Sequence, residues 1–180
     1  MESVANKTYG QSACAEAMSD IDSMIATLER LRSSHRHVDE RTDCEPPHGA
    51  ELSTSVRQLV TDSKHLVAGA LTAATDRETR LRAGVETAMH TLAAVVAQSC
   101  RLLTAADPPA GVGDVTDCVL EAARSLRSTV EAAGRAVVEP AAAAARSDPG
   151  ETDCRKNTLL GTAAVLAKSL SVLVQKVKTV

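Results

Sequence analysis

Residues 156–180 read KNTLLGTAAVLAKSLSVLVQKVKTV, and this stretch places small and aliphatic side chains at a helical period. Spacings of three and four residues bring the apolar positions onto one face of a helix. Four earlier segments follow the same design, so the chain is predicted to form a helical bundle. A bundle without a polar centre usually acts by holding partners on its faces. The apolar positions of this stretch are Leu159, Leu160, Ala163, Leu166, Ala167, Leu170, Leu173, Val174 and Val177.

The composition favours helices that pack closely through small side chains. Phe and Trp are absent, Tyr9 is the only aromatic residue, and Ala, Leu and Val dominate. A chain of 180 residues is long enough to bury an aliphatic core without disulfides or metal. We therefore expect one helical-bundle domain covering residues 1–180.

The distribution of charged and apolar residues excludes some classes of function and indicates the cellular compartment. The formal net charge is -3, and the charged residues are spread along the chain. This pattern does not indicate a binding surface for nucleic acid or an anionic membrane. No run of about 18 uninterrupted apolar residues predicts a membrane span, and residues 1–10 lack the apolar core of a signal peptide. Five cysteines at irregular spacings suit reduced thiols. These features predict a cytoplasmic protein.

Proline, glycine and capping residues divide the chain into five predicted helices, at about 12–34, 51–72, 76–105, 114–137 and 151–180. Between them lie a long polar loop at 35–50, a Pro/Gly loop at 106–113 and a Pro/Gly turn at 147–151. Short connections favour antiparallel neighbours. The predicted fold is all-α, an up-and-down bundle of five antiparallel helices, with the fifth helix central and the first peripheral.

The sequence offers little for catalysis, and we expect neither an enzyme nor a cofactor. The sharpest chemical cluster is His35, His37, Cys44 and His48, whose imidazoles and thiolate could bind zinc. Their spacing matches no established zinc finger, so a solvated polar loop is the favoured interpretation. A zinc-binding regulatory module is the alternative.

Hydroxyl side chains interrupt the apolar stripes of several predicted helices. On or near a buried face, a Ser or Thr hydroxyl can donate to the backbone carbonyl four residues earlier. Such hydroxyls either fill space in a tight core or weaken the core so that one helix can be released to a partner. The residues concerned are Ser63, Thr87, Thr91, Ser99, Thr129, Thr162 and Ser169.

Three stretches resemble the Ala-, Ser-, Thr- and Val-rich bundles of the talin rod and its vinculin and alpha-catenin relatives. They are SVRQLVTDSKHLVAGAL at 55–71, GVETAMHTLAAVVAQSCRLL at 84–103 and NTLLGTAAVLAKSLSVLVQKVK at 157–178. The resemblance implies an adaptor or scaffold of cytoskeletal or cell-adhesion complexes, in the cytoplasm, at the cytoskeleton or at cell junctions. Vinculin, actin and short leucine- and aspartate-rich helices are the partners that it implies. Gly84 and the serines depart from the apolar pattern of the family's vinculin-binding helix.

Partner binding is expected through a released helix or through a groove that receives an amphipathic helix from another protein. Two alternatives stay open: a bundle like the focal-adhesion-targeting domain, and a structural or oligomerisation bundle in a larger scaffold. The sequence does not give the oligomeric state. The candidate partner-binding residues are Leu81, Val85, Met89, Leu92, Val95, Val96, Leu59, Val60, Leu66, Lys168, Lys176 and Lys178.

Overall fold

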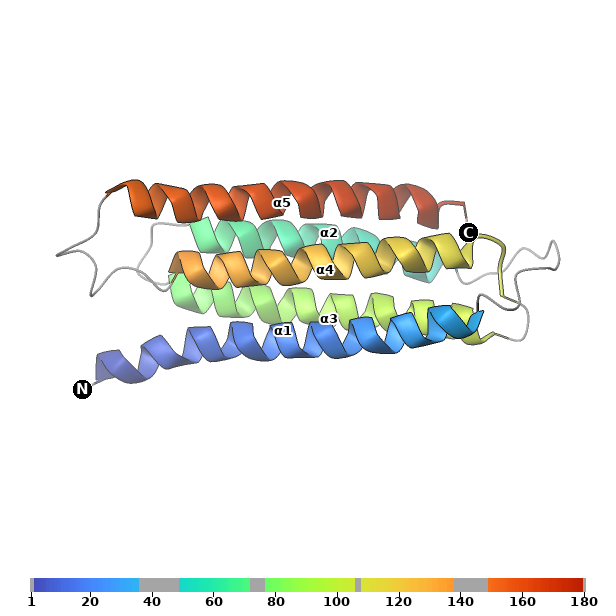
Figure 1. The fold of residues 1–180 in the computed structure, drawn as a ribbon, viewed down its shortest axis with the longest axis horizontal. Coiled ribbons are helices and arrows are strands. Elements are labelled where there is room, and N and C mark those ends of the chain that lie inside the picture. Colours follow the sequence, from blue (N-terminus) through green and yellow to red (C-terminus); the bar gives the residue numbers. More distant parts are fainter. Residues whose placement is uncertain (1, 36–48, 72–76, 106–107, 138–148, 180) are drawn as a thin grey trace.

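In the computed structural model the described residues form five long helices (Figure 1). The structure describes residues 2–35, 49–71, 77–105, 108–137 and 149–179. The described residues contain no strand, and the predicted all-helical bundle is confirmed. The helices are α1 (Glu2–His35), α2 (Gly49–Leu71), α3 (Arg77–Thr104), α4 (Val112–Val137) and α5 (Pro149–Val177).

Helices that follow one another in the sequence run in opposite directions along the long axis of the bundle, whereas α1 and α3, which also contact each other, run in the same direction (Figure 1). In the α1–α4 pair, Arg32 contacts Asp117 near one end, and Cys14 lies against Gly134 near the other. In the α2–α3 pair, Thr91 donates a hydrogen bond to Asp62, and a Cβ built on Gly84 would lie 3.0 Å from the Cα of Leu66. In both pairs the residue numbers change in opposite senses, as antiparallel packing requires.

The observed helix ends differ from the predicted ones where a turn signal lies inside a helix. α1 begins at Glu2 and not at residue 12, and α2 begins at Gly49, inside the predicted loop 35–50. α5 begins at Pro149, which was predicted to lie in a turn. Proline is tolerated in the first helical turn because its fixed φ suits a helix and its missing N–H leaves no bond unmade. Most of the loop 35–50 lies outside the described residues.

Gly111 forms the turn that starts α4. Its φ of 81° lies in the left-handed region, which glycine enters without steric cost. The Val112 amide donates to the Pro109 carbonyl at 3.2 Å, and the Val115 amide donates to the Gly111 carbonyl at 3.1 Å. The helix therefore starts inside the predicted loop 106–113, and Asp114 lies in its first turn.

α4 is the central helix, so the prediction that the fifth helix is central is wrong. α4 contacts all four other helices, whereas α5 contacts α2 and α4. The reason lies in side-chain size and in the width of the apolar face. α4 carries small residues such as Ala122, Ala133 and Gly134 on a wide buried face, which lets helices approach from several sides. α5 buries one narrow stripe, made of Leu159, Leu166, Leu170, Leu173 and Val177.

α1 lies at the edge of the bundle, as predicted, and contacts α3 and α4. Its buried side chains include Ile21 and Leu28, both fully buried. Beside this apolar contact, ion pairs between described residues link α1 to α4, among them Arg32–Asp117, Glu29–Arg124 and Asp22–Arg127.

Candidate protein-interaction groove

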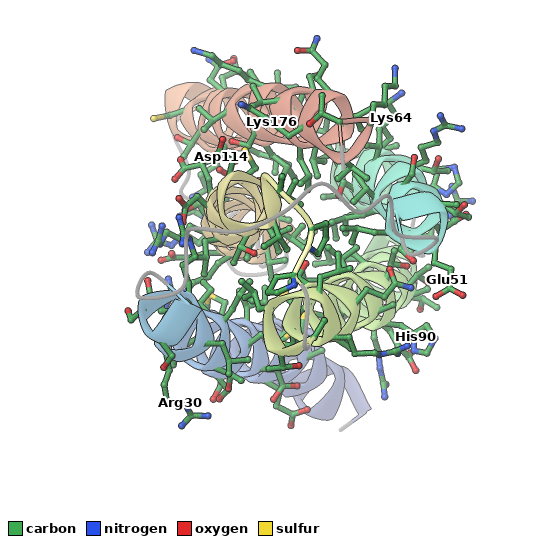
Figure 2. The ribbon with its side chains drawn as sticks, turned by 90° about the vertical axis from the view of Figure 1, so that its right-hand side faces the viewer. Arg30, Glu51, Lys64, His90, Asp114 and Lys176 are labelled. Carbon is green, nitrogen blue, oxygen red and sulfur yellow. The ribbon has the colours of Figure 1, made fainter. Side chains whose placement is uncertain are left out.

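An apolar groove lies between α2 and α5. It encloses about 670 Å³. In Figure 2, α5 lies beside α2, and Lys64 lies on the side of α2 that faces α5. The residues that line the groove are Val60, Ser63, Lys64, Val67, Ala68, Leu71, Ala163, Leu166, Ala167, Leu170, Ser171, Val174, Gln175 and Lys178.

Helical spacing explains why these residues share one surface. On both helices successive lining positions are one or three residues apart, which places them on one helix face, along the edge of the buried stripe and not at its centre. Small side chains, such as Ala68 on α2 and Ala163 and Ala167 on α5, leave the two walls apart. From Ala163 to Lys178 the α5 wall extends about 22 Å, at 1.5 Å per residue. This length corresponds to four turns of a partner helix.

The groove has an apolar floor and a basic edge. Leu166 and Leu170 are buried beneath it, whereas Val60, Val67 and Val174 are half-buried in its walls. Lys64 and Lys178 are exposed, and the described residues that line the groove include no Asp or Glu. The surface therefore complements an apolar segment with acidic flanks.

Ser63 is an exception to the hydroxyl pattern predicted from sequence. Five of the seven hydroxyls donate to the carbonyl four residues earlier, as predicted: Thr87, Thr91, Ser99, Thr129 and Ser169. Thr162 donates instead to the carbonyl three residues earlier. Ser63 is 4% exposed, and its Oγ has no hydrogen-bond partner. The prediction is wrong for Thr162 in register and for Ser63 altogether.

Most of the aliphatic candidates from the sequence lie in the core and not in the groove. Met89 is half-buried, and Val60 is the aliphatic candidate that lines the groove. With the bundle closed, the buried residues face other helices, so they could meet a partner only after a helix was released. The buried candidates are Leu81, Val85, Leu92, Val95, Val96, Leu59 and Leu66.

The three lysine candidates of the last helix fall in different surroundings. Lys178 lines the groove. Lys176 faces Asp114 of α4, with 3.8 Å between Nζ and Oδ2, and Figure 2 shows the two side chains close together. Lys168 is exposed and is not among the lining residues. The three therefore do not form one basic strip.

Sequence reasoning missed several groove residues, among them Val67, Leu71 and Val174. Their signal was present, because each lies next to a core position at helical spacing. The sequence did not reveal which helix lies beside α2, because the spacing of apolar residues within one helix does not identify the neighbouring helix.

The described residues contain no group of three or more His, Cys, Asp or Glu side chains that could hold a metal ion. Of the zinc candidates, His35 ends α1, and His37, Cys44 and His48 lie outside the described residues. Burial raises the pKa of the Cys14 thiol above its ordinary value and favours the protonated form.

One described helix is long and apolar enough, by length and composition, to cross a membrane. The segment is Asp153–Val177, with a mean hydropathy of 1.5, and 22% of the apolar window is buried in the bundle. Core helices of water-soluble proteins meet the same two criteria. The expectation of a chain without a membrane span therefore stays a prediction.

No family model and no curated protein matches the chain. The resemblance to talin-type bundles stays a prediction.

Proposed function

We propose that the protein is a non-catalytic interaction module that receives an amphipathic helix of another protein in the α2–α5 groove. The observation that carries the proposal is the apolar groove of about 670 Å³ with Lys64 and Lys178 at its edge and no carboxylate among its described lining residues. A partner helix with a leucine stripe would bury apolar surface there, and its acidic flanks would meet the two lysines. The adhesion or cytoskeletal setting is part of the proposal and rests on the sequence resemblance.

Groove binding is preferred to release of α2 or α3 because it needs no unfolding. The apolar faces of these two helices are buried against the rest of the bundle, and Gly84 brings α3 close to Leu66 of α2. Releasing either helix would expose fully buried leucines such as Leu59 and Leu92. Each buried leucine contributes about 1.5–3 kcal/mol to stability.

The direct test measures binding of a designed helical peptide, with a leucine stripe flanked by aspartates, by fluorescence anisotropy. Ala167→Glu places a carboxylate in the groove wall, and Ala164→Glu is the matched control on the same helix. Both alanines are exposed, and Ala164 does not line the groove. We expect at least a tenfold loss of affinity for Ala167→Glu and little change for Ala164→Glu. Equal affinities for the two variants would refute groove binding.

The role of the basic edge is tested by charge reversal. Lys178→Glu should weaken peptide binding about two- to fivefold, which is typical of an exposed ion pair, and added salt should reduce the difference. Lys168→Glu is the matched control, because Lys168 is exposed on the same helix outside the groove. Equal effects of the two reversals would indicate general charge attraction and count against a defined basic edge.

The setting and the oligomeric state need separate measurements. Pulldown with vinculin head and cosedimentation with filamentous actin test the adhesion setting, and failure of both would remove that part of the proposal. Light scattering tests whether the groove is filled by a second copy. A dimer that Ala167→Glu converts to a monomer would replace the partner helix with a copy of this chain.

A further inference from the structure

Ser63 is a buried hydroxyl without a partner on the wall of the α2–α5 groove. Ser63 is 4% exposed, and its Oγ makes no hydrogen bond within the part of the chain that the structure describes. Every other buried Ser or Thr in the described residues has a partner. Those residues are Thr91, Ser99, Thr116, Ser125 and Thr129.

The neighbouring residue on α2, Asp62, is also buried and polar, but its hydrogen bonds are made within the bundle. Asp62 is 3% exposed and lies toward α3, where it accepts hydrogen bonds from Gln58 and Thr91. Ser63, one position further along the helix, lines the groove beside α5 and has no such partner. A buried hydroxyl without a hydrogen bond lowers stability, so the internal packing of the bundle does not explain Ser63.

The position of Ser63 in the groove points to an external hydrogen-bond partner. On the α2 wall it lies between Val60 and Val67 and directly before Lys64. The Ser63 Oγ atom exposes less than 1 Å², so it must rotate about the Cα–Cβ bond to meet a ligand in the groove. After that rotation, a carboxylate in the groove accepts a hydrogen bond from the Ser63 hydroxyl and pairs with the Lys64 ammonium group. Hydrogen bonds to charged groups contribute more than neutral ones, especially where water is excluded.

We propose that Ser63 is a specificity-determining residue that donates a hydrogen bond to an Asp or Glu of the partner helix. This inference rests on the proposed function of the groove and adds to it a chemical requirement for the partner. The partner's acidic residue lies within its apolar stripe, between hydrophobic positions, and not at the stripe's edge. A partner with an uninterrupted leucine stripe leaves the Ser63 hydroxyl buried without an acceptor and binds more weakly.

The test uses a set of designed peptides that differ only in the position of a single aspartate within the apolar stripe. The affinity of each peptide is measured by fluorescence anisotropy. The proteins compared are the wild type, Ser63→Ala and Ser171→Ala. Ser171 lines the same groove, but its hydroxyl donates to the Ala167 carbonyl at 2.8 Å, so it is a matched control. Thermal unfolding checks folding, and Ser63→Ala should be at least as stable as the wild type because it removes an unpaired buried hydroxyl.

We expect one aspartate position to bind the wild type about tenfold more tightly than the others. Ser63→Ala should remove this preference, and Ser171→Ala should keep it. If the all-leucine peptide binds wild type best, or if Ser63→Ala keeps the aspartate preference, the role of Ser63 is refuted while groove binding stands. If no peptide binds the wild type, both the role of Ser63 and the proposed function are refuted.

Discussion

Gly84→Ala should destabilise the protein, although alanine is the better helix former. Gly84 lies within α3, and a Cβ at this position would lie 3.0 Å from the Cα of Leu66 on α2. That separation is shorter than an ordinary carbon–carbon contact of about 3.5–4.0 Å. Because the opposing atom is backbone, relief requires α2 itself to move away from α3.

The magnitude follows from two opposing terms. Replacing glycine by alanine inside a helix stabilises by about 1 kcal/mol, and overpacking a close contact costs about 1–3 kcal/mol. Gly161→Ala is the matched control, because Gly161 is inside α5 and nothing lies within 4 Å of the position that the new methyl group would take. The propensity term is shared, so the difference between the two variants isolates the packing term. We expect that difference to be about 2 kcal/mol.

Urea denaturation, followed by circular dichroism, gives the unfolding midpoint of each variant. A shift of the midpoint with an unchanged m-value reports a change in stability. Gly161→Ala should raise the midpoint, and Gly84→Ala should lower it. The reasoning is refuted if Gly84→Ala stabilises the protein as much as Gly161→Ala does. That result would mean that α2 and α3 separate readily, and it would favour helix release over groove binding.

Three other predictions concern the interior and the α1–α4 contact. Thr91→Val removes a hydrogen bond to the buried Asp62 carboxylate and should cost about 2 kcal/mol in urea denaturation. The exposed Thr87→Val is its control and should stay within about 0.5 kcal/mol of wild type, so equal losses would contradict this account. Double-mutant cycles should give the two-bond Arg32–Asp117 pair a coupling of about 1 kcal/mol, and a value near zero would contradict this. Burial raises the pKa of Cys14 above its ordinary value of 9.0, so the unfolded thiol ionises first as pH rises. Stability should therefore fall above about pH 9, and a pH series should show a smaller fall for Cys14→Ala.

Helical spacing was sufficient to predict the fold class and the approximate helices. Each long stripe identified a helix, and Pro–Gly signals separated them, so errors were confined to helix ends such as Pro149. The position of each helix in the bundle was not predictable in the same way. A wide buried face with small residues made α4 central, whereas the alanine-rich face of α5 misleadingly indicated a central helix. Leu160 and Val165 of that helix are 49% and 55% exposed.

The groove was predictable in kind but not in place. A groove for an amphipathic helix was expected, with Lys168, Lys176 and Lys178 among the candidate residues, and of these Lys178 does line the groove. Its opposite wall comes from α2, far earlier in the chain, and spacing within either helix does not reveal that pairing. Ser63 shows the same limit, because sequence indicates that its hydroxyl can bond to its own helix but not that it lacks this bond.

The contact between α2 and α5 has a consequence for synthesis of the chain. Helices α1 to α4 emerge from the ribosome before α5, so α2 carries an uncovered apolar edge until the last helix has been made. During that interval the edge could be recognised by a chaperone, and the two-walled groove does not yet exist. A partner that binds this groove, as proposed, therefore meets only chains whose translation has passed α5.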